Sequence, residues 1–179
     1  GVSLNQDGSR PFGRDHGGRA GCLPGARRRP GAAAPAIPHR ADPAAPTVVG
    51  QCATPGGAIR ATIAGDYAYV ADDEAGIQIL DISQIDEPEQ KGSFDTPGRA
   101  FDVAVQDSYA YVADIDAGLR VVNIANPANP YEVGFYDSPG NAWGVAISGS
   151  YVLVADGVSG LRVVNISNPT NPYEVGFYD

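Results

Sequence analysis

The chain has 179 residues and a formal net charge of −9, and hydrophobic residues make up 43% of it. An acidic surface repels the phosphate backbone, so this charge argues against nonspecific binding to nucleic acid. No apolar run approaches the roughly 18 residues of a membrane-spanning helix, so we expect no membrane span.

The composition changes sharply near residue 40, which divides the chain into two parts. Residues 1–40 contain seven Arg against two Asp, whereas residues 41–179 contain five Lys or Arg against 19 Asp or Glu. All nine Tyr and the single Trp lie in the second part. Because aromatic and β-branched residues build the core of a β-sheet, we expect only the second part to fold, and residues 1–40 are predicted to be a disordered basic tail.

A shift of reading frame is a second explanation of the first 40 residues. Arg27-Arg28-Arg29-Pro30 stands 42 residues before Tyr69-Val70-Ala71-Asp72. A coding run for Tyr-Val-Ala-Asp that is read out of frame can yield consecutive arginines. Residues 1–40 are therefore either a genuine leader or an out-of-frame segment, and translation of the DNA in all frames distinguishes the two.

From residue 41 onwards the sequence repeats with a period of 42 residues, the signature of a repeat architecture. The copies begin with Thr54-Pro55-Gly56, Thr96-Pro97-Gly98 and Ser138-Pro139-Gly140, and 22 of 29 positions are identical between 109–137 and 151–179. Before the first complete copy, residues 46–52 align with the last strand-like run of the other copies. This segment is predicted to be the outer strand of a preceding unit.

Each copy contains four strand-like runs separated by turns. In the middle copy the runs are Phe101–Gln106, Tyr109–Asp114, Leu119–Ala125 and Tyr131–Asp137. Asp, Asn, Gly and Pro separate them, and these residues suit tight turns. Four antiparallel strands every 40 to 45 residues are typical of a β-propeller blade.

The sequence therefore predicts an all-β fold, a β-propeller segment of three four-stranded antiparallel blades that follow the single outer strand. The blades are expected at about 53–95, 96–137 and 138–179. Propellers close with about four to eight blades, so we expect a fragment or an oligomer rather than a ring formed by this chain alone. Open sheet edges and apolar blade faces then favour self-association.

Three stretches resemble a known repeat family. Gly-Leu-Arg-Val-Val-Asn-Ile-Ala-Asn-Pro-Ala-Asn-Pro (118–130), its copy at 160–172, and Gly-Ile-Gln-Ile-Leu-Asp-Ile-Ser (76–83) are similar to LVIVD repeats. The resemblance covers about residues 41–179. It implies a propeller-type architecture and an extracellular or cell-surface location in a bacterium or archaeon. The family has no general catalytic activity, so the resemblance implies no active site.

Strand alternation places one set of loops on a common face of the blades. These loops precede the first strand of a blade or join its second and third strands, and they contain Arg99, Asn141, Trp143, Asp114 and Asp116. In a complete ring this face surrounds the mouth of the central channel, so we expect a protein or carbohydrate ligand there. For Trp143 the alternative is packing between blades.

Acidic turns on the same face are candidates for a calcium site. Asp72 and Asp73 in the first copy, and Asp114 and Asp116 in the second, resemble short oxygen-rich calcium loops. The third copy retains Asp156 but lacks the second carboxylate. The alternative is that the recurring Asp accepts hydrogen bonds from turn amides. Calcium is the only cofactor that the sequence suggests.

No catalytic constellation is visible in residues 41–179, which contain no His. Arg120 and Arg162 recur near acidic residues, and we expect exposed ion pairs that contribute little to stability. The favoured interpretation is a noncatalytic binding scaffold. The alternatives are part of an enzyme or calcium-dependent binding propeller whose site needs further blades, and a truncated product with no function of its own.

Overall fold

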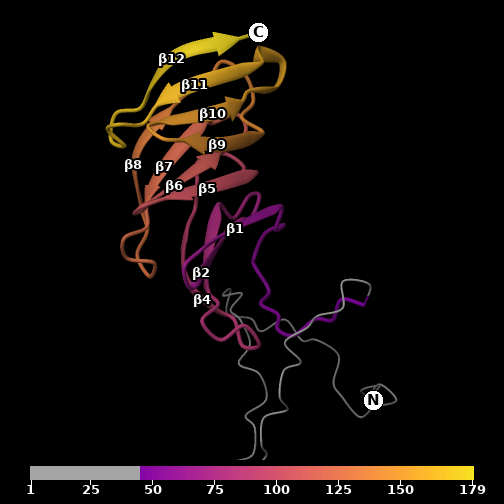
Figure 1. Ribbon diagram of the computed structural model, residues 1–179. Helices are drawn as coiled ribbons and strands as arrows, with labels where there is room; N and C mark the ends of the chain where they lie inside the picture. The colour runs from indigo at the N-terminus through magenta and orange to yellow at the C-terminus, as the bar shows by residue number, and fades with distance from the viewer. Residues whose placement is uncertain (1–44) are drawn as a thin grey trace, which may run out of the picture.

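The computed structural model describes residues 45–179, so the tail predicted at 1–40 lies outside the described residues. Three four-stranded antiparallel sheets follow one another along the chain and are stacked face to face (Figure 1). The strands of the first sheet are β1 (Arg60–Ala64), β2 (Tyr67–Ala71), β3 (Ile77–Asp81) and β4 (Glu89–Phe94). Those of the second are β5 (Asp102–Gln106), β6 (Tyr109–Ala113), β7 (Leu119–Asn123) and β8 (Tyr131–Tyr136). Those of the third are β9 (Gly144–Ser148), β10 (Tyr151–Ala155), β11 (Leu161–Asn165) and β12 (Tyr173–Tyr178), with a short 3₁₀ turn, Gly157–Ser159, between β10 and β11.

The predicted all-β, blade-like fold is confirmed, and the three sheets share their irregularities as well as their strands. The first hairpin of each sheet turns through a residue with positive φ, namely Gly65, Asp107 and Gly149. Only Gly and residues such as Asp adopt this conformation readily in a two-residue turn. The pairing of the third strand with the fourth shifts register at the same place in all three sheets. The 42-residue period is therefore a structural period.

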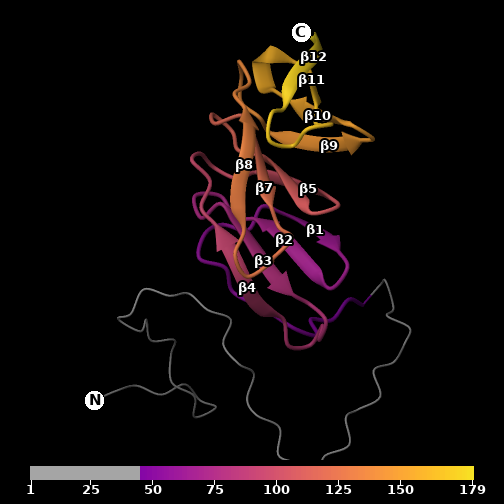
Figure 2. The same cartoon turned by 90° about the vertical axis from the view of Figure 1, so that its left-hand side faces the viewer.

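Two apolar layers hold the stack together. We call the side of a sheet that is turned toward the next sheet in chain order its forward face, and the opposite side its rear face. Ile77 and Ile79 on the forward face of the first sheet join one buried cluster with Val112 of the second. Leu119 on the forward face of the second sheet packs in the same way with Val152 of the third. Figure 2 shows the stack from the side, with β12 at the far end from the first sheet.

Glycines on the fourth strand let neighbouring sheets approach closely. A Cβ atom on Gly92 of β4 would lie 2.1 Å from the carbonyl oxygen of Pro127, and one on Gly134 of β8 would lie 2.4 Å from that of Pro169. Both separations are far below van der Waals contact, so only glycine fits while the sheets keep their spacing. Each sheet therefore rests on a turn of the next sheet at its outer edge.

The structure assigns no strand to the segment 46–52, which was predicted as an outer strand, because its first strand is β1. Its path is nevertheless that of an outer strand. A Cβ on Gly50 would lie 2.3 Å from the carbonyl oxygen of Ile85, the same relation to the first sheet that Gly92 has to the second. Within the described residues this segment has no strand beside it, and a strand is defined by a hydrogen-bonded partner.

The glycine contacts give a testable contrast between two positions with the same local sequence. Gly134→Ala is expected to lower the free energy of unfolding by about 1–3 kcal/mol, because the added methyl group overpacks the contact with Pro169. Gly176→Ala is its matched control, since nothing lies within 4 Å of the corresponding Cβ position. We expect the control to stay within about 0.5 kcal/mol of wild type in urea denaturation. Equal losses at both positions would contradict the proposed role of the contact.

Candidate functional site

Loops from consecutive sheets meet along one end of the stack, which we call the loop face. Isolated β-bridges join Asp73 to Ala100 and Ile115 to Ala142. Each bridge links the loop after the second strand of one sheet with the segment before the first strand of the next. The amides of Asp73 and Ala100 donate to each other's carbonyl oxygens at 3.1 and 3.0 Å. Side chains of two neighbouring repeats are thereby brought side by side, as the sequence predicted for this face.

The recurring aspartate lies beneath the loop face rather than on it. Asp114 is fully buried, and its carboxylate accepts hydrogen bonds from the Thr96 hydroxyl at 2.6 Å and the Gly98 amide at 2.8 Å. Asp72 and Asp156 are equally buried and accept the equivalent bonds. Each aspartate therefore fastens the Thr-Pro-Gly or Ser-Pro-Gly turn that opens its own repeat.

This burial corrects the placement of Asp114 on the ligand face, because a fully buried carboxylate offers no surface to a partner. Asp72 is excluded from that surface for the same reason. Residues 45–179 contain no group of three or more His, Cys, Asp or Glu side chains that is placed to hold a metal ion. Asp114 and Asp116 stand two residues apart, which suggested a calcium loop. In the structure, however, Asp114 is buried whereas Asp116 is exposed.

Arg99 and Asp73 form the principal charged pair of the loop face. The guanidinium donates from Nε at 2.7 Å and from Nη2 at 3.0 Å to the two carboxylate oxygens. This bidentate pair connects the second repeat to the first. The hydrogen bonds from Arg99 hold the pKa of Asp73 below its ordinary value. Asp73, with smaller contributions from Glu74 and Asp116, raises the pKa of Arg99. Asp116 is exposed in the corresponding loop of the second sheet.

Trp143 and Asn141 form a second part of the loop face. The indole stands edge-to-face on the ring of Phe101, with centroids 4.9 Å apart and planes at 89°, a preferred geometry for aromatic pairs. Phe101 is half-buried, whereas Trp143 is 42% exposed. A Cβ on Gly157 would lie 3.1 Å from the indole Nε1 and 3.3 Å from the carbonyl oxygen of Asn141. Packing against Phe101 therefore orients the indole while much of it stays open to a partner.

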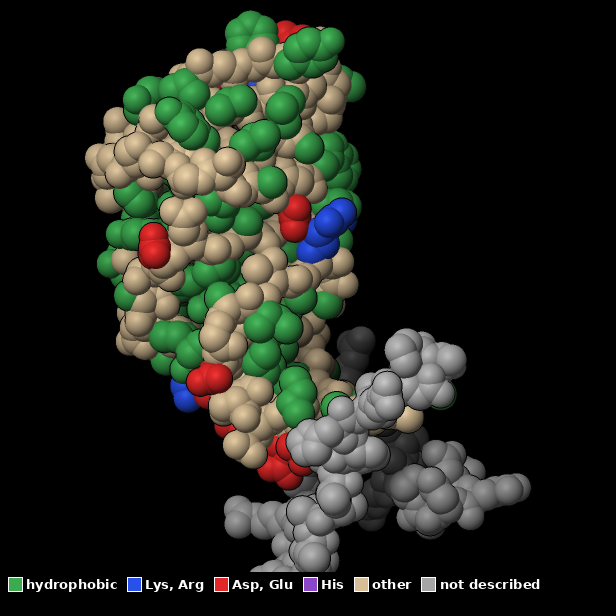
Figure 3. Space-filling model, viewed as in Figure 1, with side chains coloured by type: hydrophobic (Ala, Val, Ile, Leu, Met, Phe, Trp, Pro, Cys, Tyr) green, Lys and Arg blue, Asp and Glu red, His purple; other side chains and the backbone are tan. Residues whose placement is uncertain are grey.

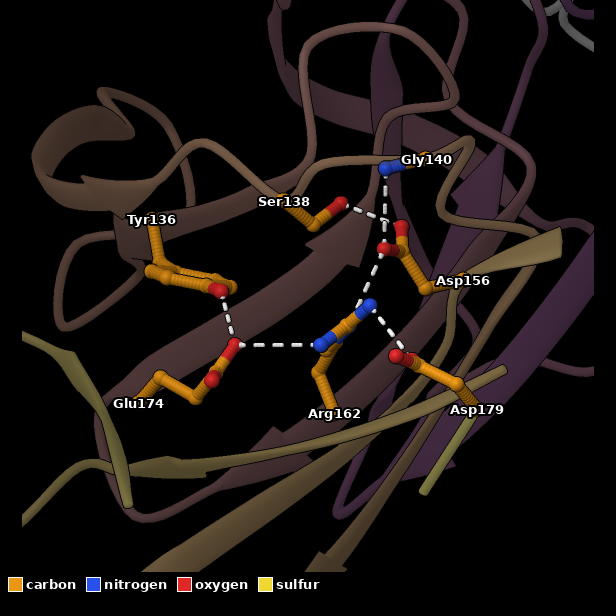
Figure 4. A network of polar contacts seen from close by, with 7 residues as sticks. All are labelled: Tyr136, Ser138, Gly140, Asp156, Arg162, Glu174 and Asp179. Carbon is orange, nitrogen blue, oxygen red and sulfur yellow. Dashed lines mark hydrogen bonds and ion pairs between the residues drawn. The ribbon is translucent and has the colours of Figure 1, made fainter. Parts of the chain in front are cut away.

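A buried network around Arg162 was missed by the sequence analysis. Arg162 is only 7% exposed, and its Nη2 donates to Asp179 at 2.7 Å. Its Nε lies 3.5 Å from a carboxylate oxygen of Asp156, and its Nη1 lies 3.9 Å from Glu174. The Tyr136 hydroxyl of the second sheet donates to Glu174 (Figure 4). Burial and this neighbouring carboxylate raise the pKa of Tyr136 to about 12.

The expectation of exposed Arg pairs was therefore wrong, because the side chains of Arg120 and Arg162 are only 11% and 9% exposed. The internal repeat contained a signal for this. In the first copy Gln78 and Gln90 stand at the positions of the Arg and the Glu of the later copies. The Gln90 side-chain amide donates to the side-chain oxygen of Gln78 at 2.7 Å. A paired exchange of charged for neutral residues indicates contact in a buried place. We interpret these networks as supports of the outer strands.

The comparison with protein families agrees with this geometry. Three consecutive LVIVD repeats match residues 55–96, 97–138 and 139–179. The chain belongs to the LVIVD repeat family. No curated protein matched the chain.

Each LVIVD repeat contains one complete sheet, the buried aspartate and the Pro-Gly of the turn that it fastens, while the Thr or Ser of that turn is the residue just before the repeat. The repeat units coincide with the physical units of the stack, since the contacts between sheets recur at the same repeat positions. The residues of the loop face do not recur in this way. Arg99 and Asn141 occupy one repeat position, and Ile59, Phe101 and Trp143 occupy another. Within residues 45–179, no helix is long and apolar enough to cross a membrane.

Proposed function

We propose that this LVIVD propeller segment is a noncatalytic binding scaffold that acts outside the cell or at the cell surface. Its partner is a protein or a carbohydrate held on the loop face. The location is carried over from the resemblance to surface and secreted proteins. The observation that carries the proposal is the 42% exposed indole of Trp143, which Phe101 holds in a fixed orientation.

The surroundings of the indole support a binding role. Asn141 lies beside it as an exposed amide that can donate and accept hydrogen bonds. The Arg99–Asp73 pair lies on the same face, one repeat earlier, and its side chains are 53% and 24% exposed. Trp and Arg are enriched where binding energy is concentrated, because they combine large contact area with directed polar groups. These residues vary between repeats that are otherwise similar, as expected of a site that is separate from the scaffold.

The arrangement of the acids supports a noncatalytic role. General acid–base chemistry needs a titratable group that can reach a substrate proton. The buried carboxylates of Asp72, Asp114 and Asp156 instead accept hydrogen bonds within their repeats, and Asp73 is held by Arg99. Residues 41–179 also contain no His. Binding rather than turnover is therefore the function that we favour.

Because Trp143 is the only Trp of the chain, its fluorescence reports on the proposed site directly. We expect a saturable change of its emission when cellohexaose, xylohexaose, chitohexaose and a library of soluble peptides are titrated in turn. Asn141→Ala is expected to weaken binding of a responsive probe about 2- to 10-fold, the effect of one lost hydrogen bond. Ser150→Ala, at an exposed residue of the turn between β9 and β10 at the other end of the stack, is the control and is expected to leave the affinity unchanged.

Failure of every probe to alter the emission of Trp143 would count against the proposed site. A parallel titration with calcium chloride tests the alternative of a calcium-dependent binder. An ion that binds only the folded state raises the melting temperature. A marked rise at millimolar calcium would favour that alternative over a scaffold that needs no metal.

A further inference from the structure

The forward face of the third sheet is apolar and uncovered. The forward-face residues Ile77 and Leu119 of the first two sheets are fully buried, whereas their counterpart Leu161 is 37% exposed. Val175 and Tyr178 on the same face are 48% and 79% exposed. In Figure 3, hydrophobic side chains are spread over this end of the molecule. The third sheet therefore presents the surface that its two predecessors use to bind the next sheet.

The outer edge of this surface has an empty contact position. Gly92 and Gly134 each face the carbonyl oxygen of a turn in the following sheet, whereas nothing lies within 4 Å of a Cβ built on Gly176. The sequence Tyr-Glu-Val-Gly-Phe-Tyr is identical in β8 and β12. The edge of the third sheet is thus built for the same contact, with a turn like Pro127-Ala128 or Pro169-Thr170.

The rear face of the first sheet carries the complementary residues, part of which the chain before β1 covers. Val70 and Leu80 at its centre are 6% and 9% exposed and line a pocket together with Cys52 and Thr54, whereas Ile63 is 68% exposed. Their counterparts in the second sheet, Val112 and Val122, are part of the first buried layer. An open pocket of about 260 Å³ lies on this face and is lined by Cys52, Thr54, Ala58, Ile59, Arg60, Ala61, Val70 and Leu80. A forward face brings large side chains that can fill such a pocket.

We propose that the forward face of the third sheet docks onto the rear face of the first sheet of a second copy of this chain. The occupant is a second copy because its first sheet carries the same repeat residues that cover the forward faces of the first two sheets. Such a head-to-tail contact joins two different surfaces, so it makes a ring if the rotation closes.

The segment 46–52 competes for part of this surface. Gly50 already faces Ile85 and Asp86 of the first sheet, which is the place that Gly176 of the second copy takes on docking. Residues 46–51 pair with no strand within residues 45–179, so their displacement breaks no sheet there. Docking is therefore expected to exchange residues 46–51 of one copy for β12 of the other.

Sedimentation equilibrium of the full chain tests the proposal. We expect the wild type to associate from a monomer of 18.5 kDa to a dimer as its concentration rises from about 1 to 200 μM. Gly176→Arg is expected to weaken this association at least 100-fold while the melting temperature of the monomer is unchanged, because the position is open within one chain. A wild type that stays monomeric at 200 μM, or a Gly176→Arg variant that dimerises normally, overturns the proposal.

Two further variants make the result specific. Phe177→Ser is the matched control on the same strand, because Phe177 is 61% exposed but its ring covers the guanidinium of Arg162 instead of the forward face. The first repeat carries Ser93 at this position, and we expect unchanged association. Gly50→Arg should expel residues 46–51 and tighten the dimer. If Gly50→Arg leaves the association unchanged or weakens it, head-to-tail docking is overturned, and pairing of two forward faces is indicated instead. The fluorescence of Trp143 tests the loop face independently of all these outcomes.

Discussion

Replacement of Leu119 by Ala is expected to lower the free energy of unfolding by about 3 kcal/mol, within the range of 2–5 kcal/mol for buried Leu. Leu119 is fully buried and belongs to the layer between the second and third sheets, with Val121, Val152 and Val164. Truncation removes apolar contacts and leaves a cavity that two stacked sheets can close only in part. Urea denaturation followed by circular dichroism measures the loss.

Leu161→Ala is the matched control, because Leu161 occupies the same repeat position on β11 as Leu119 on β7. It is 37% exposed, so its truncation in the monomer is expected to cost less than about 1 kcal/mol. The stabilities of the two variants are to be measured at low micromolar protein concentration, where the proposed dimer is dissociated. Similar losses for the two substitutions would show that stacking of the sheets does not determine stability at this position.

Asp114→Ala is expected to destabilise the fold by about 3 kcal/mol, because the Thr96 hydroxyl and the Gly98 amide lose their acceptor in a buried place. Both groups bond the carboxylate directly. The exposed neighbour Asp116 provides the control, and Asp116→Ala is expected to change stability by less than about 0.5 kcal/mol. A variant of Asp114 as stable as this control would refute the fastening role of the carboxylate.

The same substitution has an expected pH dependence. Burial raises the pKa of Asp114 above its ordinary 3.8, and the bonds from Thr96 and Gly98 offset only part of this effect. Between the two pKa values the folded state holds more protons than the unfolded state, so the contribution of Asp114 to stability falls as the pH rises through the raised pKa. The loss caused by Asp114→Ala should therefore be larger at pH 3.5 than at pH 7. If the stability lost in Asp114→Ala increased with pH, the pKa of Asp114 in the folded state would be lowered instead.

The repeat architecture followed from the sequence because its signals are local. Turn residues such as Asp107 stand at fixed distances from apolar runs, and alternation within each run identifies a strand. The outer segment 46–52 was the exception. Its residues match the repeat, but a strand also needs a hydrogen-bonded partner, which the segment lacks within the described residues.

The candidate site was predicted only in part. The loops of Arg99, Asn141 and Trp143 do lie on one face, since strand alternation fixes which loops share an end. The sequence did not indicate that Arg99 pairs with Asp73 of the preceding repeat, or that Asp114 is buried. Both facts depend on the distance between two neighbouring sheets, which cannot be read from the spacing of residues within one repeat.

By itself, the sequence determined the 42-residue period, the four strands of each unit, the turn chemistry and membership of the LVIVD repeat family. The tertiary structure alone decided which copy of an equivalent residue is buried. Residues 131–137 and 173–179 are identical in sequence, yet Gly134 is packed against Pro169 while the position of Gly176 is open. The physical reason is that burial of a sheet face depends on the neighbouring sheet, whereas the strand itself depends on its own residues.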